Sequence, residues 1–428
     1  MESVATPAER FAAAKKRGTH PLTTEFISQF EFGFDEFQIQ ACQAVEDGKA
    51  VLVAAPTGAG KTVVGEFAAF SSLSRGKKCF YTTPIKALSN QKYFEFVERF
   101  GEDRVGLLTG DTNINSDADV LVMTTEVLRN MLYANSSTLT NLGSVVMDEV
   151  HYLADKFRGA VWEEVLIHLM ESVQVISLSA TVSNAEEFGE WLGEVRGSTE
   201  VIVSEIRPIP LYQHVLIGNR LIDLFSEPGR VNPEILGLER EALRRQKAPR
   251  GRRDRYDDSD NRLTRADIID KLQRENLLPA ITFIFSRAGC DAAVKQCLQA
   301  GIKLTSAEER LEIVTTAQRC TQNLAEEDLE VLGYRDWLLA LERGIAAHHA
   351  GLLPSFKGAV EDLFKRGLVK AVFATETLAL GINMPARTVV LEKLTKWNGE
   401  AHVSITPGEY TQLTGRAGRR GIDIEGNA

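Results

Sequence analysis

Short runs of apolar residues, bounded by turn residues, recur through the first half of the chain. They read Ala50–Ala55, Lys78–Thr83, Val120–Thr124, Val145–Asp148 and Val173–Ser179. Runs this short and this rich in Val, Ile, Leu and Met are typical of strands buried on both faces of a parallel sheet. Helical patterns such as Thr62–Leu73 and Ala160–Met170 lie between them. Strands that alternate with helices predict βαβ units, and therefore an α/β fold with a parallel sheet.

The same alternation resumes in the second half of the chain. The apolar runs there are Ile281–Phe285, Gly344–His348, Val369–Ala374 and Thr388–Leu391. Between the halves, residues 244–255 carry seven basic residues and one acid, and Asp257-Asp258-Ser259-Asp260 follows. Such a segment predicts a solvated linker or insertion, with direct nucleic-acid contact as the alternative. We expect an N-terminal arm (1–30), a first domain (31–218), a charged linker or insertion (219–275) and a second domain (276–428).

Composition narrows the class of protein. Of the 428 residues, 44% are hydrophobic and 25% charged, which excludes a mostly disordered, collagen-like or coiled-coil chain. The net charge of −10 argues against nucleic-acid binding by bulk charge but permits a local basic groove. Five cysteines without a CxxC pair indicate neither a disulfide framework nor a zinc site, and fit a reducing, cytoplasmic location. We see no signal peptide in Met1–His20 and no apolar run long enough to span a membrane.

Residues Ala55–Thr62 read APTGAGKT, after a predicted strand and at the start of a predicted helix. This is the P-loop pattern, except that Ala replaces the first Gly. The backbone of Pro56, Thr57, Gly58, Ala59 and Gly60 would cradle phosphates at the start of the helix. Lys61 would reach the β- and γ-phosphates, and the Thr62 hydroxyl would bind Mg²⁺.

Two carboxylates end the run Val145–His151, which reads VVMDEVH. The carboxyl ends of strands are where open α/β sheets bind ligands. Asp148 is suited to hold Mg²⁺ together with Thr62, and Glu149 to activate the attacking water as a general base. His151 would couple this site to its neighbours; it has no second ligand at a metal-site spacing.

Three arginines lie near the end of the chain, in Gln412–Gly421, which reads QLTGRAGRRG. Arg416 and Arg419 are three residues apart and would share a face of a helix. Cations supplied from a second domain can stabilise charge on a transferring phosphoryl group. A basic tail is the alternative.

These stretches together resemble the superfamily 2 helicases. Ala55–Thr62, Asp148–His151, Ser179–Thr181 and Gln412–Gly421 stand in the order of motifs I, II, III and VI, and Asp-Glu-Val-His is the box of DExH proteins. Further matches are Phe37-Gln38, Thr83–Gln91, Thr124–Glu126, His348–Gly351 and Phe373–Pro385. They point to the superkiller-type RNA helicases, and most closely to the actinobacterial HelY-like helicases. The resemblance covers the chain from about Phe34 to Ile422.

The resemblance implies two tandem RecA-like domains that bind ATP and Mg²⁺. Lys61, Thr62, Asp148 and Glu149 would hold ATP·Mg²⁺ and activate water, and Gln38 would read the adenine. Gln412, Arg416 and Arg419 would face the γ-phosphate, while Gly381 and Asn383 sense the nucleotide. Ser179 and Thr181 would couple hydrolysis to strand movement.

The resemblance also implies a nucleic-acid track across both domains. Its residues would be Pro84, Lys86, Thr109, Gly110, Thr125 and Arg129 in the first domain and Ser286, Arg287, Gly351 and Thr375 in the second. Hydroxyls, amides and a few cations suit phosphate and sugar contacts, which predicts little sequence preference. The alternative for each residue is a turn or capping role. The adjacent His348 and His349 would face opposite ways on a strand, which excludes a metal pair.

Asn398-Gly399, flanked by β-prone residues within Leu391–Ile405, predicts a hairpin. In the resembling helicases a hairpin here parts the duplex, and Trp397 would stack near the separating base pair. The alternative is a structural hairpin at the sheet edge. We expect a helicase core without the winged-helix and ratchet domains of that family.

The sequence therefore favours an ATP-dependent translocase that unwinds RNA, with 3′-to-5′ polarity implied by the resemblance. Its partners would be single-stranded or partly duplex RNA, or DNA, and proteins of RNA decay or the ribosome, with no membrane. Three alternatives stay open: a DNA repair helicase of the same fold, a nucleotide-switched clamp that binds RNA without unwinding it, and a P-loop kinase.

Overall fold

The computed structural model describes residues 19–154, 159–180, 185–217, 220–227, 229–238, 240, 263–378, 384–397, 401–419 and 421–428. The chain divides into two compact units, Met1–Arg207 and Pro208–Ala428. The division falls before the boundary expected at residue 218. Residues 208–217 therefore belong to the second unit, because Leu211 and Tyr212 pair with the last strand of that unit.

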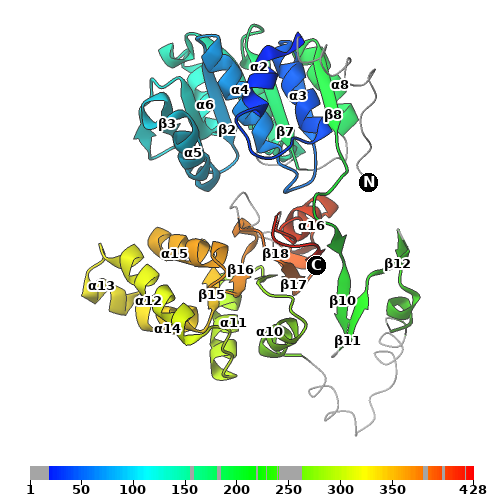
Figure 1. Ribbon diagram of the computed structural model, residues 1–428, viewed down its shortest axis with the longest axis vertical. Coiled ribbons are helices and arrows are strands. Elements are labelled where there is room, and N and C mark those ends of the chain that lie inside the picture. The colour runs from blue at the N-terminus through cyan, green and yellow to red at the C-terminus, as the bar shows by residue number, and fades with distance from the viewer. Residues whose placement is uncertain are drawn as a thin grey trace. The chain divides into compact units, whose positions relative to one another are not determined.

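A sheet with the strand order β4-β3-β5-β2-β6-β7-β1-β8 forms the centre of the first unit (Figure 1). All neighbouring strands are parallel except β4, which is antiparallel to β3. The strands are β1 (Ala50–Ala54), β2 (Lys78–Thr83), β3 (Val105–Leu108), β4 (Asn113–Ile114), β5 (Val120–Thr124), β6 (Leu142–Met147), β7 (Gln174–Ser179) and β8 (Thr199–Val203). The predicted bounds of the strands now labelled β2 and β5 are confirmed.

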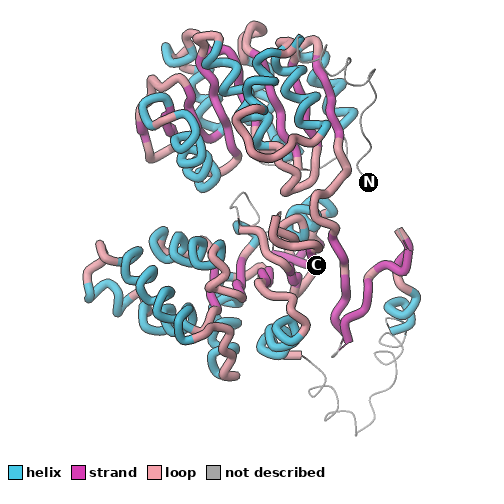
Figure 2. The backbone as a smooth tube through the Cα atoms, in the orientation of Figure 1, coloured by secondary structure: helices cyan, strands magenta, loops and turns pink. Residues whose placement is uncertain are grey.

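Helices cover both faces of this sheet (Figure 2). The helices are α2 (Pro21–Ile27), α3 (Glu36–Glu46), α4 (Thr62–Ser74), α5 (Lys86–Phe100), α6 (Thr125–Tyr133), α7 (Gly159–His168) and α8 (Ala185–Arg196). Alternate strand residues enter two separate cores: Val51 and Val53 pack with α3, α4 and α5, while Leu52 packs with α6, α7 and α8. Both faces are buried, so the strands read as continuous apolar runs. Phe26 of α2 is fully buried, so the expected N-terminal arm contributes to the core.

The second unit has a smaller sheet with the order β15-β16-β14-β17-β20-β9, all parallel. Its strands are β9 (Leu211–Tyr212), β14 (Ala280–Phe283), β15 (Ile345–His348), β16 (Ala371–Ala374), β17 (Thr388–Leu391) and β20 (Gly426–Asn427). The helices are α10 (Arg265–Arg274), α11 (Arg287–Gln299), α12 (Ala307–Thr321), α13 (Glu326–Val331), α14 (Tyr334–Glu342), α15 (Pro354–Lys365) and α16 (Pro407–Thr414). Two cores again lie on opposite faces of the sheet, and the α/β class is confirmed for both units.

The expected linker contains regular structure in its described residues. It includes β11 (Arg220–Asp223), which pairs with β10 (His214–Ile217), then β12 (Phe225–Glu227) paired with β13 (Arg230–Val231), and α10. The basic run 244–255 and Asp257–Asp260 lie outside the described residues. Of the expected charged linker or insertion, the two ends thus carry regular structure: a hairpin strand at one end and a capped helix at the other.

Candidate functional site

The P-loop connects β1 to α4, as the pattern predicts. Gly58 and Gly60 both have φ +83°, a left-handed conformation that side chains strain and glycine adopts freely. α4 begins at Thr62, so the loop ends at the N-terminus of a helix that runs to Ser74. A helix N-terminus and the amides of a tight loop favour an anion.

The side chain of Gln38, on α3, holds the P-loop through hydrogen bonds. Its Nε2 donates to the carbonyl oxygens of Ala59 (3.3 Å) and Gly60 (3.0 Å), and its Oε1 accepts from the Asp35 amide at 2.8 Å. The residue is 1% exposed. Both amide hydrogens have a partner within the protein, so adenine recognition by the Gln38 Nε2 would require the loop to release it.

The two residues after the glycines carry the chemistry expected of a P-loop. Lys61 Nζ donates to the carbonyl oxygens of Ala55 (2.7 Å) and Pro56 (3.0 Å), which holds the ammonium along the loop. The Thr62 hydroxyl accepts from Lys92 Nζ at 3.3 Å. Lys92 lies on α5, is buried, and pairs with Glu95 at 2.6 Å. Its position was not predictable from the P-loop pattern, because it comes from another helix.

Asp148 follows β6 and is buried, with a donor at each carboxylate oxygen. The Tyr81 hydroxyl donates to Oδ2 at 2.7 Å, and the Glu149 amide donates to Oδ1 at 2.9 Å. Burial, and then the neighbouring Glu149 carboxylate, raise the pKa of Asp148, whereas Lys92, Tyr81 and Lys61 oppose the rise. Sequence reasoning missed Tyr81, which lies on β2, beside β6.

Glu149 has a left-handed backbone, with φ +54°, an uncommon conformation for a residue with a side chain. Its Oε2 lies 3.3 Å from His151 Nδ1. Burial, followed by the charge of Lys61, lowers the pKa of His151 to about 4. The imidazole is therefore neutral at physiological pH. A left-handed backbone at a residue with a side chain, as at Glu149, is the kind of local strain found at functional sites.

The residues around Asp148 fit a magnesium ion. Thr62 and Asp148 offer hydroxyl and carboxylate oxygens, the ligand type that Mg²⁺ prefers. A buried carboxylate whose pKa is raised by burial also lacks full charge compensation, which a cation would supply.

Strand order explains how these residues meet. β6, β7 and β1 are neighbours, and Asp148, Ser179 and the P-loop lie at their carboxyl ends. The Ala55 amide donates to the Ser179 carbonyl oxygen at 3.1 Å, so the P-loop starts against the end of β7. Ser179 is thus next to the phosphate loop; Thr181 lies outside the described residues.

The expected nucleic-acid residues of the first unit lie at the other half of the same edge, after β2, β5 and β3. Pro84 is buried and Lys86 is exposed. Lys86 pairs with Asp111, which lowers the pKa of that carboxyl. The Thr109 hydroxyl also donates to Asp111, at 3.1 Å, and Gly110 is exposed between them. Asp111 was not predicted, and a nucleic-acid phosphate would compete with it for Lys86.

Thr125 and Arg129 lie on α6. Thr125 is fully buried, and its hydroxyl donates to the Thr83 carbonyl oxygen at 3.3 Å. The Thr125 side chain thus joins the start of α6 to the end of β2. Arg129 is partly exposed and lies 3.7 Å from Glu164.

In the second unit, the expected nucleic-acid residues lie at the ends of the neighbouring strands β14, β15 and β16. Ser286 caps α11 by accepting from the Gly289 amide at 3.2 Å, and Arg287 is exposed. A side chain at Gly351 would have its Cβ 3.6 Å from Arg287 Cδ, which places these two residues side by side. The Thr375 hydroxyl bonds that of Thr377 at 2.9 Å.

The two adjacent histidines contact different carboxylates. His348 Nε2 lies 2.8 Å from Glu361 on α15, and His349 Nε2 lies 3.0 Å from Asp291 on α11. The described residues contain no group of three or more His, Cys, Asp or Glu arranged to hold a metal ion.

The prediction that Arg416 and Arg419 share a helix face is wrong. α16 ends at Thr414, and Gly418 has φ +87°, which no helix accommodates. The carbonyl oxygen of Arg416 accepts from the Ala386 amide at 2.9 Å. Arg419 forms two bonds of 2.7 Å with Asp423, so its guanidinium is engaged within the unit. Gln412 lies on α16 and is partly buried.

The hairpin predicted near Asn398-Gly399 is confirmed, with β18 (Thr395–Trp397) antiparallel to β19 (His402–Ser404). Trp397 is 56% exposed, and its ring contacts that of His402 edge-on. The turn residues 398–400 lie outside the described residues, as do Gly381 and Asn383.

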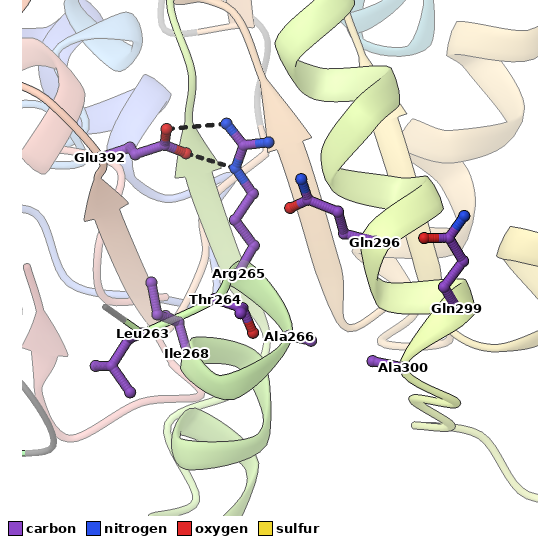
Figure 3. A pocket seen from close by; sticks show the side chains of 9 residues that line it. All are labelled: Leu263, Thr264, Arg265, Ala266, Ile268, Gln296, Gln299, Ala300 and Glu392. Carbon is purple, nitrogen blue, oxygen red and sulfur yellow. Dashed lines mark hydrogen bonds and ion pairs between the residues drawn. The ribbon is translucent and has the colours of Figure 1, made fainter. Parts of the chain in front are cut away.

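A pocket of about 670 Å³ opens in the second unit between α10, α11 and β17 (Figure 3). Arg265 and Glu392 form a bidentate ion pair across it, at 2.7 and 2.9 Å. None of the predicted catalytic, nucleotide-binding or nucleic-acid residues lines this pocket, so it is not the predicted active site.

Comparison with known families supports the motif order. Residues 35–188 match the DEAD/DEAH box helicase family, and residues 292–421 match the helicase conserved C-terminal domain. The two matches lie in the two compact units, consistent with tandem RecA-like domains. None of the described helices is both long enough and apolar enough to cross a membrane.

The chain is similar to several curated helicases. It is 60% identical over 420 residues to the probable helicase HelY of Mycobacterium leprae, covering 94% of this chain and 45% of that protein. Identity is 44% over 446 residues to a chloroplastic DExH-box ATP-dependent RNA helicase of Arabidopsis thaliana (94% and 37%). It is 40% over 412 residues to human Superkiller complex protein 2 (93% and 33%). The chain thus spans less than half the length of these relatives.

Proposed function

We propose that this chain, which belongs to the DExH-type helicases and carries their two domains in tandem, is an ATP-driven motor that moves along RNA and unwinds it. The observation that carries the proposal lies within the first unit. A P-loop, a buried carboxylate and a strained glutamate occupy the carboxyl ends of neighbouring strands, and polar residues line the remainder of that edge. One half of the edge suits a triphosphate, and the other suits a sugar–phosphate backbone.

Each side chain has an assigned role in this proposal. Lys61 and the P-loop amides bind the phosphates, while Thr62 and Asp148 would hold Mg²⁺. Magnesium, when bound, neutralises phosphate charge. Glu149 orients and deprotonates the attacking water. Neutral His151 contacts Glu149 without adding a positive charge beside the phosphates.

The second unit supplies further groups in this proposal. Gln412 and Arg416 contact the γ-phosphate, and Gly381 and Asn383 respond to the nucleotide. Arg419 also faces the γ-phosphate in this proposal. In addition, its ion pair with Asp423 stabilises the loop that carries Arg416.

Polar groups that contact phosphate and sugar position a strand without reading its bases, so we expect little sequence preference. RNA is favoured over DNA because two of the similar proteins are named as RNA helicases. Polarity from 3′ to 5′ follows from the family resemblance. Proteins of RNA decay or the ribosome are the proposed partners, and one similar human protein is named as part of the superkiller complex.

The deciding experiment measures the ATPase rate without nucleic acid, with single-stranded RNA and with single-stranded DNA. Strong stimulation by RNA supports the proposal, whereas stimulation by DNA alone would indicate a DNA helicase. No stimulation by either polymer, together with nucleotide-dependent RNA binding, would indicate a clamp. The Glu149→Gln variant should bind nucleotide normally and lose hydrolysis.

Direction and unwinding are tested with duplexes that carry a single-stranded tail at one end. Displacement only from the 3′-tailed duplex supports the proposed polarity. Displacement only from the 5′-tailed duplex would reverse it, and ATP hydrolysis without displacement of either would show that this chain does not unwind RNA.

A further inference from the structure

The hairpin β18–β19 forms a sheet of its own. Its strands pair with each other, and no ladder joins them to the six-stranded sheet of the second unit among the described residues. An isolated two-stranded hairpin is marginally stable in water. Side chains must therefore fix the position of this hairpin.

Lys396 provides such a contact. Successive side chains of a strand point to opposite faces, and its neighbours Thr395 and Trp397 are exposed whereas Lys396 is partly buried. Its Nζ donates to Glu376 Oε2 at 2.7 Å and to Glu409 Oε1 at 2.6 Å. Burial lowers the pKa of Lys396, but the bonds to the two carboxylates outweigh it and raise the pKa. The ammonium is therefore charged.

The two carboxylates belong to elements assigned to function. Glu376 directly follows Thr375, an expected nucleic-acid contact, and begins the 3₁₀ turn Glu376–Leu378. Glu409 lies in the first turn of α16, where its Oε2 accepts from the Thr406 amide at 2.7 Å and completes the capping box. The same helix carries Gln412. One ammonium thus joins the hairpin, the Thr375 turn and the Gln412 helix.

We propose that Lys396 is a positioning residue that couples the hairpin to the nucleotide-contacting helix α16 and to the Thr375 turn. Without the lysine, two carboxylates would face each other, and nothing polar would tie the hairpin to either element through this position. The proposal rests on the proposed function, because it takes Gln412 as a nucleotide contact.

The alternative is an ion pair that only stabilises the unit. A stabilising pair affects unfolding, whereas a coupling residue also affects how the hairpin responds to nucleotide. Trp397, next to Lys396, is a built-in reporter of that response. The chain has four tryptophans, so labelling with 5-fluorotryptophan gives a simple ¹⁹F spectrum, in which Trp397→Phe identifies the hairpin resonance.

The experiment compares the wild-type protein with Lys396→Met, Lys396→Arg and the matched control Lys393→Met. Lys393 is exposed and lies on the same segment. Binding of a fluorescent ATP analogue is measured first, and the Trp397 resonance is then followed on addition of a non-hydrolysable ATP analogue with magnesium and single-stranded RNA. We expect the resonance to shift in the wild type and in Lys393→Met, to shift less in Lys396→Arg, and to stay in place in Lys396→Met.

The factor by which single-stranded RNA tightens binding of the ATP analogue should fall about tenfold in Lys396→Met, in the range typical of a coupling free energy between two sites. A full Trp397 shift in Lys396→Met, or no shift in a wild type that binds the analogue, would overturn the coupling role and leave the ATPase proposal standing. A wild type that binds no nucleotide would instead remove the proposed function, and the coupling role with it.

If Lys396→Met fails to fold, Glu376→Gln keeps the bond to Glu409 and weakens only the link to the Thr375 turn. The RNA-dependent part of the Trp397 shift should then be lost, and the nucleotide-dependent part retained. An unchanged RNA-dependent shift would contradict the coupling role.

Discussion

At the scale of single residues, the Tyr81 hydroxyl contacts Asp148, the proposed magnesium ligand. It donates to Oδ2 at 2.7 Å in a fully buried position. A hydrogen bond to a charged group is worth about 1.5–3 kcal/mol, so Tyr81→Phe should weaken Mg²⁺-dependent nucleotide binding roughly tenfold or more.

The same substitution removes a donor that favours the carboxylate, so the pKa of Asp148 should rise further. Because the proposed hydrolysis needs Asp148 as a carboxylate, the acidic limb of the pH–rate profile should move to higher pH. Magnesium titrations of nucleotide binding and the pH profile of ATP hydrolysis test this, with Tyr93→Phe, another buried tyrosine of the same core, as the control. Unchanged magnesium dependence would show that Tyr81 only fills space.

His151 should make the first unit sensitive to acid. Burial lowers its pKa from 6.5 to about 4. Between these two pH values, His151 binds a proton in the unfolded chain but not in the folded chain. Stability is therefore lost as the pH falls from about 6.5 toward 4, by about 2 kcal/mol by pH ~5. His151→Gln should flatten this part of the curve in urea unfolding experiments, and the exposed His168→Gln should not. An unchanged slope in His151→Gln would contradict the assignment.

At the scale of elements, close approach of α4 to β2 fixes both the P-loop and Tyr81. A Cβ at Gly65 would lie 2.8 Å from the Tyr81 ring and 3.2 Å from Val146. Gly→Ala inside a helix gains up to about 1 kcal/mol from propensity, but overpacking a buried contact costs about 1–3 kcal/mol. Gly65→Ala should therefore destabilise the unit and disturb the bond between Tyr81 and Asp148.

The matched control is Gly193→Ala in α8, where an added Cβ meets nothing within 4 Å. It should stabilise the same unit by up to about 1 kcal/mol. Thermal or urea unfolding of both variants measures the difference. A stabilised Gly65→Ala would mean that α4 can move away from the sheet without loss.

Elements buried on both faces were the most predictable part of the fold. β2 and β5 kept their predicted bounds because all their residues except Lys78 and Thr124 are buried, and most of the buried ones are apolar. The expectation for Arg416 and Arg419 failed because residue spacing does not reveal where a helix ends, and Gly418 requires a left-handed turn. Of the site, the P-loop and the acidic pair were predictable because each lies within a few residues of chain.

Contacts between distant segments were not predictable from the sequence. The bond from Tyr81 to Asp148 and the bracing of the P-loop by Gln38 depend on which strands and helices become neighbours. The pairing of Lys396 with Glu376 and Glu409 likewise joins three elements. A motif indicates which residues carry the proposed chemistry. The side chains that position those residues lie at distant places in the sequence.

At the scale of the whole molecule, the division between the units depends on two very short strands. β9 and β20 are two residues each and carry no apolar run, so a boundary near residue 218 was the natural expectation. The structure joins them at the edge of the second sheet. The Gly426 amide donates to the Pro210 carbonyl oxygen at 2.8 Å, and the Ala428 amide donates to that of Tyr212 at 2.9 Å.

This arrangement predicts where the chain can be cut. A fragment of residues 208–428 should fold cooperatively, whereas 219–428 loses β9 and the backbone bonds to β20. Ile209 would also be lost, and it packs closely on the Gly418 turn between Arg416 and Arg419. Several backbone bonds at about 1 kcal/mol each make a loss of about 3 kcal/mol the expected difference in unfolding free energy.

Thiol labelling provides the measurement, because Cys290 and Cys297 are buried and burial raises the pKa of these thiols to about 12 and about 11. They should be protected from a thiol reagent in 208–428 and react faster in 219–428, in proportion to the population that opens. The fragment 1–207 should bind a fluorescent ATP analogue and hydrolyse ATP poorly, since Gln412 and Arg416, the proposed contacts of the γ-phosphate, are missing. Equal protection in the two C-terminal fragments would show that β9 is dispensable, and full hydrolysis by 1–207 would remove the second unit from the chemical step.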